Sequence, residues 1–251
     1  MGKIIAIANQ KGGVGKTTTC INLGCALRNR GKKILIVDCD PQGNCTSGLG
    51  VDKASMPNVY SVLLGGAKVE DAVRYTPYCD VLPANKELSG ATVELVEAEN
   101  REFRLKEALE PLKNQYDYIL LDCPPSLELL TLNALCAADS VLVPLQCEYF
   151  AMEGLNDLMT TVKLTNKRLN PDLEIDGVVL TMYDSRTKLS EQVAAEIRQY
   201  FGERVYDTTI PRNVRLSEAP SHGKPVMAYD RLSKGTRAYL RLASEFIKRQ
   251  R

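Results

Sequence analysis

Short runs of almost uninterrupted apolar residues alternate with longer segments that repeat apolar positions every three to four residues. The apolar runs predict strands at residues 3–8, 33–37, 118–121, 140–145, 175–182 and 205–210. The longer pattern predicts helices at residues 16–30, 101–113, 128–137, 150–169, 189–201 and 234–249, and Gly31 is the expected C-cap of the first. Because the strands are apolar on both faces, they indicate a parallel sheet that helices cover on both sides.

Residues 46–100 show a less regular pattern, and here we expect one or two helices inserted near the edge of the sheet. No internal repeat, low-complexity tract or Pro/Ser-rich linker divides the chain. The sequence therefore predicts one α/β domain over residues 1–251, with a mostly parallel twisted sheet flanked by helices on both faces.

Composition is ordinary for a globular protein, with 44% hydrophobic and 25% charged residues among 251, which excludes disordered, collagenous and disulfide-knot chains. Eight cysteines include no C-x-x-C pair and a single histidine cannot complete a common zinc site, so we expect buried, reduced cysteines. No apolar run approaches the ~18 residues of a spanning helix. Met1-Gly2-Lys3 leads into the first strand without a cleavage site or a myristoylation signal, so we expect a cytoplasmic protein.

Charge is balanced over the whole chain but not along it. The 32 Lys and Arg residues and 31 Asp and Glu residues give a net charge of +1. Residues 181–251 hold 14 basic and 8 acidic residues, a local charge of +6, which leaves residues 1–180 at −5. The last third of the chain therefore carries the positive charge that a polyanionic partner would need.

A glycine-rich segment lies between the first predicted strand and the first predicted helix. It follows the phosphate-binding pattern G-x-x-x-x-G-K-[ST], except that Gln10 replaces the first glycine. Its backbone N–H groups and the helix dipole are expected to bind phosphate oxygens through Gly12, Gly13, Val14, Gly15, Lys16, Thr17 and Thr18. We expect Lys16 to reach the β- and γ-phosphates and the Thr17 hydroxyl to ligate Mg²⁺. The alternative is a glycine-rich turn that binds nothing.

Two of the predicted strands end in aspartates. Asp122 follows its strand as a Walker B carboxylate does, and we expect it to hold Mg²⁺ directly or through water. Asp38 and Asp40 end the second strand, and alternation along a strand places both on one side, facing the same crevice at the carboxyl edge of the sheet. The alternative is a simple turn, because Asp, Pro and Gly all favour turns.

The sequence K-G-G-V-G-K-T-T of residues 11–18 resembles the deviant Walker A motif of the ParA/MinD class of P-loop ATPases. By itself the sequence leaves Lys11 either as a solvated loop lysine or as a catalytic group. The resemblance implies that Lys11 reaches across an ATP-bound sandwich dimer to the partner's phosphates, as an arginine finger does. It also implies ATP and Mg²⁺ as cofactors, Asp40 as the group that orients the attacking water, and Asp38 close to the metal.

Two further stretches, residues 146–155 and 210–225, are similar to the chromosomal ParA proteins that are often called Soj. This resemblance implies a nucleotide-base pocket near Pro211 and Asn213. Many relatives carry an Asn-Arg pair after the strand that ends near residue 181, whereas this chain has Met182-Tyr183. The preference for adenine therefore rests on the resemblance alone.

Function in that family is DNA segregation. The resemblance implies an ATP-dependent switch for chromosome or plasmid segregation, in which an ATP-bound homodimer binds double-stranded DNA non-specifically on the nucleoid. A ParB-type centromere-binding partner stimulates hydrolysis and releases the dimer. Residues 212–251 support this, with 10 basic and 3 acidic residues. Arg186 and Arg215 match DNA-contacting arginines of Soj-like relatives; weaker candidates are Lys188, Lys224, Arg231, Lys234 and Arg237.

Two other classes of protein share this predicted fold. A MinD-like ATPase would bind membrane through an amphipathic C-terminal helix, and residues 239–246 do form an apolar stripe. We expect no stable membrane association, because the stripe is short and follows Gly235 without a linker. A metabolic P-loop enzyme is the other class, either a nitrogenase-type reductase or a ligase of the dethiobiotin-synthetase type. The reductase needs cluster-ligating cysteines, and Cys123 has no suitably placed second ligand.

Overall fold

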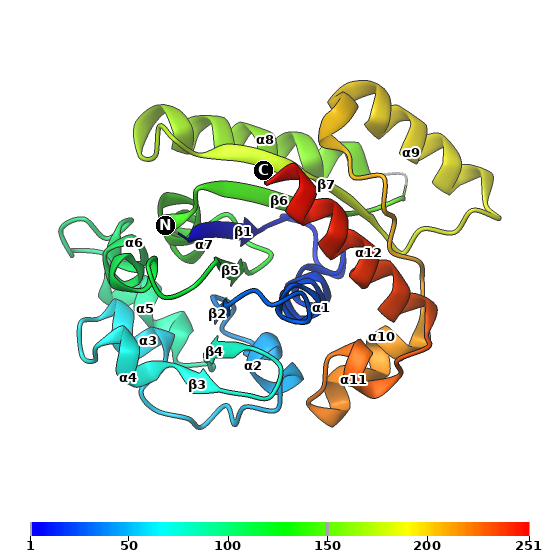
Figure 1. Ribbon diagram of the computed structural model, residues 1–251. Helices are drawn as coiled ribbons and strands as arrows, with labels where there is room; N and C mark the ends of the chain where they lie inside the picture. Colours follow the sequence, from blue (N-terminus) through cyan, green and yellow to red (C-terminus); the bar gives the residue numbers. More distant parts are fainter. Residues whose placement is uncertain (1, 149–150, 251) are drawn as a thin grey trace.

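Seven strands form one sheet in the computed structural model, which describes residues 2–148 and 151–250 (Figure 1). The strand order is β3-β4-β2-β5-β1-β6-β7. The strands are β1 (Lys3–Ile7), β2 (Ile34–Asp38), β3 (Arg74–Tyr75), β4 (Asp80–Leu82), β5 (Tyr118–Asp122), β6 (Ser140–Gln146) and β7 (Glu174–Thr181). All neighbouring strands pair in parallel except β3 and β4, so the prediction of a mostly parallel sheet is confirmed.

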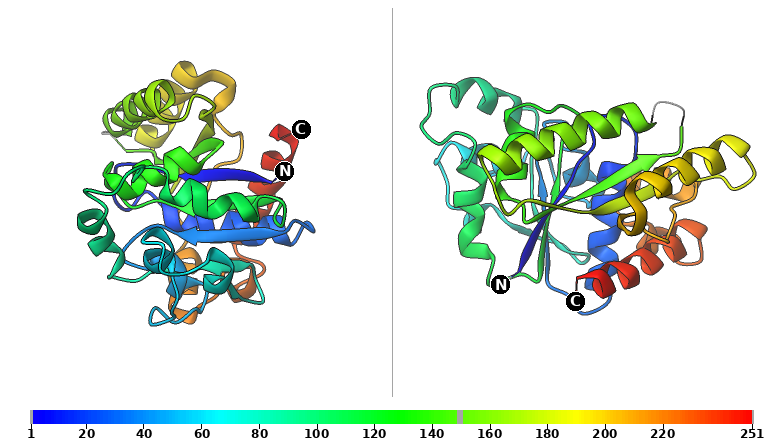
Figure 2. Two further views of the ribbon diagram at one scale, coloured as in Figure 1. Left: turned by 90° about the vertical axis from the view of Figure 1, so that its left-hand side faces the viewer. Right: turned by 90° about the horizontal axis from the view of Figure 1, so that it is seen from above.

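Helices form a layer on each face of the sheet (Figure 2). One layer contains α1 (Lys16–Arg28), α2 (Asn44–Gly48), α10 (Val214–Glu218), α11 (Val226–Tyr229) and α12 (Lys234–Arg249). The other contains α3 (Val59–Leu63), α4 (Val69–Ala72), α5 (Leu88–Glu94), α6 (Arg104–Leu109), α7 (Leu129–Ala137), α8 (Ala151–Arg168) and α9 (Lys188–Phe201). Three short 3₁₀ turns are η1 (Glu110–Leu112), η2 (Gly202–Arg204) and η3 (Ala219–His222).

The two apolar cores explain why the strands are apolar at almost every position. Alternate side chains of a strand point to opposite faces of the sheet. On β1, Ile4 and Ala6 belong to the core beneath α3 to α9, whereas Ile5 and Ile7 belong to the core beneath α1 and α12. All four side chains are buried, so neither face of this strand tolerates a polar residue.

The strand predicted at residues 205–210 is not formed, and this prediction was wrong. Val205 makes only an isolated parallel bridge to β7. In the middle of the segment, the backbone N–H groups of Asp207 and Thr208 donate to the carboxylate of Glu245 on α12, at 2.8 and 2.9 Å. The backbone still bonds to β7 at the two ends of the segment, where the N–H groups of Tyr206 and Ile210 donate to the carbonyl oxygens of Val178 and Leu180 at 2.9 and 2.8 Å. The side chain of a distant helix thus interrupts the ladder in between, which no local pattern in the sequence predicts.

Other boundaries differ by a few residues. The first helix ends at Arg28 with Asn29 as its C-cap, and Gly31 follows with a φ of 80°. The helix expected at residues 101–113 begins at Arg104 and tightens into η1. Residues 46–100 hold more than the one or two helices expected, because α3, α4, α5 and the strands β3 and β4 all lie there. The helix expected at 150–169 is described from Ala151, since positions 149 and 150 lie outside the described residues.

Candidate nucleotide-binding site

The loop between β1 and α1 contains two glycines in a backbone conformation that other residues rarely adopt. The φ angle is 75° at Gly13 and 91° at Gly15. Gly15 is the N-cap of α1, and no side chain of the described chain caps the helix there. The first N–H groups of α1 and the positive end of its dipole are therefore available to an anion.

Two polar side chains fix this loop against the sheet. Asn9 donates from Nδ2 to the carbonyl oxygen of Pro144 on β6 at 2.8 Å, and its Oδ1 accepts from the backbone N–H of Lys11 at 3.0 Å. Thr181, at the end of β7, donates to the carbonyl oxygen of Val14 at 2.8 Å. The sequence did not predict a role for Asn9 or Thr181; both are polar residues at strand ends, the one signal that could have identified them.

Lys16 is held in the loop with its charge directed inward. Its side chain is largely buried, with 7% of the residue exposed, and its Nζ donates to the carbonyl oxygen of Lys11 at 3.0 Å. Burial lowers the pKa of Lys16, and the neighbouring acidic groups, chiefly Asp122, oppose that shift. A phosphate in the loop would compensate the cost of burying this ammonium group.

Lys11 lies at the edge of the loop and forms an ion pair with Glu148. The Nζ and Oε2 atoms are 2.9 Å apart, and the two side chains are 34% and 46% exposed. Glu148 also accepts a hydrogen bond from the side chain of Gln146. Lys11 is therefore bound within its own chain and remains partly open to solvent.

Asp38 and Asp122 are paired residues on the neighbouring strands β2 and β5, and both are fully buried. Asp38 accepts hydrogen bonds from the backbone N–H and the hydroxyl of Thr46 at 2.8 and 2.7 Å, and from the backbone N–H of Asp40 at 3.2 Å. Burial raises the pKa of Asp38 to about 6 in spite of these donors. The sequence did not predict the role of Thr46, because no local pattern around Thr46 indicates that it binds a buried carboxylate eight positions earlier.

Asp122 differs from Asp38 in having no hydrogen-bond partner for either carboxylate oxygen among the described residues. Burial and the neighbouring charge of Asp38 raise its pKa well above the ordinary value, and the Thr17 side chain lies near enough to oppose that shift. A buried carboxylate without donors is the group that a cation would stabilise. Asp122 and Thr17 therefore fit the expected magnesium site.

A metal ion here would need ligands from outside the protein. The described residues contain no cluster of three or more His, Cys, Asp or Glu side chains that could hold a metal. Mg²⁺ takes six oxygen ligands and usually keeps several waters, with substrate phosphates among the rest. The sparse protein contribution at Thr17 and Asp122 is typical of a metal that enters with a nucleotide.

A cavity of about 370 Å³ lies over the loop. It is lined by Gly12, Gly13, Gly15, Lys16, Thr17, Thr18, Asp40, Gln42, Asn44, Pro125 and Met182. Asp40 reaches this cavity, but Asp38 is fully buried and turned to Thr46. The expectation that both aspartates face one crevice was wrong, because β2 ends at Asp38 and strand alternation does not extend to Asp40.

A second cavity of about 310 Å³ adjoins the first. Pro211 and Asn213 line it, and Gly15, Thr18 and Met182 line both cavities. The structure therefore brings the two residues expected in a base pocket next to the phosphate loop. Met182 has a φ of 48°, in the left-handed region that residues other than glycine rarely adopt and in which Asn is enriched among them. A methionine is therefore an unusual residue for this backbone position.

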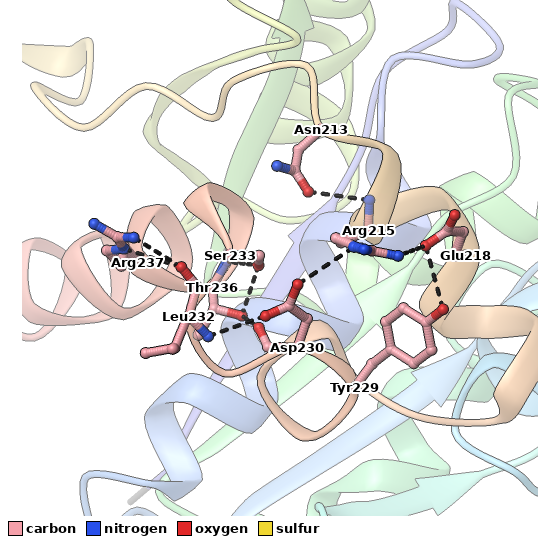
Figure 3. A network of polar contacts seen from close by, with 9 residues as sticks. All are labelled: Asn213, Arg215, Glu218, Tyr229, Asp230, Leu232, Ser233, Thr236 and Arg237. Carbon is pink, nitrogen blue, oxygen red and sulfur yellow. Dashed lines mark hydrogen bonds and ion pairs between the residues drawn. The ribbon is translucent and has the colours of Figure 1, made fainter.

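The three basic residues expected to contact DNA lie in different surroundings. Arg186 is 86% exposed and forms an ion pair with Asp184. Arg215 binds the carboxylates of Glu218 and Asp230 at 2.8 and 3.3 Å, in the network that Figure 3 shows. Lys188 is exposed at the first position of α9.

The cysteines and the last helix bear on the other two classes of protein. All eight cysteines are buried and unbridged, and burial raises the pKa of Cys123 well above its ordinary value, so Cys123 is not placed to ligate a cluster at a surface. On α12, Tyr239, Leu242 and Phe246 are at most 1% exposed and belong to the core with α1. No described helix is both long and apolar enough to cross a membrane.

Comparison with known proteins gives matches along the whole chain. The family model described as an AAA domain matches residues 2–175. The sporulation initiation inhibitor protein Soj of Bacillus subtilis (strain 168) is 59% identical over 248 residues, which cover 98% of each chain. The chromosome partitioning protein ParA of Caulobacter vibrioides (strain NA1000 / CB15N) is 56% identical over 254 residues, covering 99% of this chain and 95% of its own.

Solved structures give a similar result. The structure of cobyrinic acid a,c-diamide synthase from Mycobacterium smegmatis, with a bound ATP analogue and magnesium, matches with a TM-score of 0.88 at 38% identity. That match covers 100% of this chain and 96% of the synthase. The shared fold thus extends over the whole chain, from the loop between β1 and α1 to the C-terminal helices.

Proposed function

We propose, because this chain belongs to the Soj/ParA family of chromosome-partitioning ATPases, that it is a single-domain ATP-dependent switch for DNA segregation. The observation that carries the proposal is the pairing of a buried lysine, Lys16, with a buried aspartate that lacks donors, Asp122, at the N-terminus of α1. Lys16 and Asp122 offset each other only in part, and each gains a full partner when a phosphate and a cation bind together. The solved structure of the diamide synthase, 38% identical to this chain, holds an ATP analogue and magnesium, which supports ATP and Mg²⁺ as the cofactors here.

The loop binds the triphosphate of ATP. Backbone N–H groups of residues 12–18 contact the phosphate oxygens, and Lys16 moves from the Lys11 carbonyl oxygen to the β- and γ-phosphates. Mg²⁺ neutralises the phosphate charge that builds up in the transition state. Thr17 and Asp122 hold that ion, and Asp38 adds negative charge beside it from its Thr46-bound position. The cavity at Pro211 and Asn213 takes the base.

Lys11 acts on the second subunit of a homodimer. Its ion pair with Glu148 is partly exposed, and such pairs contribute only about 0–1 kcal/mol, so exchange for a partner's phosphate group costs little. Because that exchange needs both ATP and a second chain, it couples dimerisation to nucleotide binding. Asp40, which lines the phosphate cavity, positions the attacking water.

The ATP-bound dimer binds double-stranded DNA without sequence preference. Arg186, Arg215 and Lys188 are exposed cations in the basic last third of the chain, and such contacts to phosphate give salt-dependent binding that does not read sequence. Two copies on one dimer raise the affinity through avidity. Hydrolysis, stimulated by a ParB-type partner, separates the subunits and releases them from the nucleoid DNA.

The packing of α12 argues against a membrane-binding function of the MinD type. Its apolar face is already buried against α1, and its end is fixed because Arg249 donates to the carbonyl oxygens of Glu203 and Val205, both at 2.9 Å. The solved structure named as a diamide synthase is 38% identical to this chain and would favour a metabolic function. The relative named as a chromosome partitioning protein is 56% identical, which favours segregation.

Double substitution of the two arginines tests the DNA proposal. Arg186→Ala with Arg215→Ala should abolish binding to a random duplex in ATP and leave ATP-dependent dimerisation unchanged. Lys163→Ala with Lys167→Ala, two exposed cations on α8, is the matched control for lost charge and should bind DNA as the wild type does. Equal DNA binding by the arginine variant and its control, or loss of the dimer together with DNA binding, would contradict the assignment.

A further inference from the structure

A separate cavity lies among α3, α4, α6 and η1. Its volume is about 460 Å³, which is within the range of small-molecule sites. None of the described residues that line it also lines the cavity over the phosphate loop or the base pocket. Figure 1 shows α3, α4 and α6 together on the left-hand side of the molecule, whereas α10 and α12 lie on the right-hand side. The cavity is therefore separate from the proposed nucleotide site.

The inner wall of this cavity is apolar. Val62 and Leu63 of α3 and Val69 of α4 line it, and these residues are 6%, 2% and 4% exposed. All three belong to the core beneath α3 to α9, so packing fixes the wall in place. Ala67 and Ala108 also line the cavity, and their small side chains leave the space open. A ligand that fills this space needs an apolar group to cover the wall.

Arg104, at the first position of α6, is the cation within this cavity. It lines the cavity, and its Nε is buried without a hydrogen-bond partner among the described residues. No described carboxylate lies within ion-pair distance of its guanidinium. A buried donor without an acceptor costs free energy. A carboxylate accepts two parallel hydrogen bonds from a guanidinium, so a carboxylate in the cavity would supply the acceptors that the chain lacks.

The backbone on both sides of Arg104 is held by one buried side chain. Asn133 of α7 is 1% exposed. Its Oδ1 accepts from the backbone N–H of Leu105 at 3.1 Å, and its Nδ2 donates to the carbonyl oxygen of Arg101 at 2.9 Å. The start of α6 is thus fixed, and Arg104 is positioned at the cavity by the fold.

Glu107 places the opposite charge one helical turn from Arg104. Residues three positions apart on a helix are neighbours on its surface, and both of these residues line the cavity. They form no ion pair with each other or with any other described side chain. Lys68 and Glu70, both exposed, add one charge of each sign to the rim. The charges around the cavity therefore sum to zero, which favours a ligand that carries both signs.

We propose that this cavity binds an apolar α-amino acid in its zwitterionic form. The carboxylate and ammonium groups of such a ligand are attached to one carbon atom, which matches a cation and a carboxylate that lie a single helical turn apart at Arg104 and Glu107. The side chain of the ligand lies against the apolar wall. An acid or an amine alone would leave one of these two protein charges without a partner.

Titration of L-leucine by calorimetry into the wild-type chain, both free and saturated with Mg-ADP, tests the proposal. We expect one site per chain with the same affinity in both samples, because the cavity and the nucleotide site share no described lining residue. Three analogues each lack one part of the ligand: leucine amide the carboxylate, N-acetyl-leucine the ammonium group, and serine the apolar side chain. Each should bind about tenfold more weakly or worse.

Arg104→Met keeps the length of the side chain and removes its charge, so it should weaken leucine binding by about tenfold or more. Lys106→Met is the matched control, because it removes the same charge from the same helix at a position that does not line the cavity. This control should bind leucine as the wild type does. Ala67→Leu fills the cavity while leaving Arg104 in place, and it should abolish leucine binding. Circular dichroism checks that all three variants are folded.

Absence of leucine binding at millimolar concentration, or equal affinity in Arg104→Met and Lys106→Met, would overturn the proposal. N-acetyl-leucine that binds as tightly as leucine would overturn it as well, because the site would then recognise a carboxylate alone, such as the end of a peptide. The titrations of the free chain decide these outcomes without ATP or DNA. The proposed DNA-segregation function is therefore tested separately and stands if this proposal fails.

Discussion

Asp38 and Asp122 occupy paired positions on the neighbouring strands β2 and β5, yet among the described residues only Asp38 has hydrogen-bond partners. Both are fully buried; Thr46 donates twice to Asp38, and no described residue donates to Asp122. Two neighbouring buried carboxylates destabilise the folded chain when both are ionised, and the nearby Lys16 ammonium offsets only part of this cost, since the pKa of Asp122 is still raised. The nucleotide-free protein therefore stores unfavourable electrostatic energy that a metal–nucleotide complex would relieve.

Asp122→Asn should stabilise the nucleotide-free chain and remove its response to Mg-ATP. At neutral pH we expect a gain of roughly 1–3 kcal/mol in the free energy of unfolding, because a buried charge and its repulsion with Asp38 are lost. Urea unfolding with and without Mg-ATP measures both effects. Asp172→Asn, at an exposed position, is the control, and a destabilised Asp122→Asn chain would contradict the electrostatic account.

The same carboxylates set the pH dependence of the nucleotide-free chain. Burial raises the pKa of Asp38 from 3.8 to about 6, so the folded state holds a proton that the unfolded state releases. The contribution of Asp38 to stability is then present at low pH and is lost as the pH rises from about 4 to about 6. Asp38→Asn should flatten unfolding midpoints over this window; an unchanged pH profile would show that Asp38 is not the responsible group.

Lys16→Ala and Lys11→Ala should separate nucleotide binding from dimerisation. Loss of the buried Lys16 ammonium should weaken ATP binding by about tenfold or more, because it removes a charged hydrogen bond to phosphate. Lys11→Ala should bind ATP nearly as the wild type does but stay monomeric, since Lys11 is held at the surface by Glu148. Calorimetry measures affinity and sedimentation velocity measures assembly. A Lys11→Ala chain that dimerises in ATP would contradict the role in trans.

Asp40→Ala should block hydrolysis without blocking ATP binding. Removal of the group that positions water is expected to slow phosphate release by about 10²–10⁴, so the ATP dimer should persist on DNA. Phosphate release and DNA retention are measured on the same sample. Hydrolysis at the wild-type rate would rule out this role for Asp40.

The sequence predicted the long elements well because each has a strong local pattern. The parallel strands β1, β2, β5, β6 and β7 are buried on both faces, and the loop at residues 9–19 carries its chemistry in order along the chain. The conformation of the proposed phosphate-binding loop therefore follows from local sequence. Where a strand is as short as β3 or β4, too few residues show a period, and both strands were missed.

Features that depend on contacts between distant segments could not be predicted. Glu245 of α12 accepts from the backbone N–H groups of Asp207 and Thr208 and so interrupts their pairing with β7. Lys11 and Glu148 meet across 137 positions, and no pattern near either residue signals the other. The cations around a cavity of about 660 Å³ come from three segments, at Arg186, at Arg212 and along α12, that only the fold brings together. Packing and topology decide these contacts, and neither is a local property of sequence.

The central claim is that ATP turns this chain into a DNA-binding dimer. The most direct measurement is binding to a random double-stranded fragment with ATP, with ADP and without nucleotide, across a salt series, with dimerisation followed in the same samples. The account predicts binding only in ATP, indifferent to sequence and falling steeply with salt. Absence of DNA binding in ATP, with the dimer present in the same tube, would contradict it.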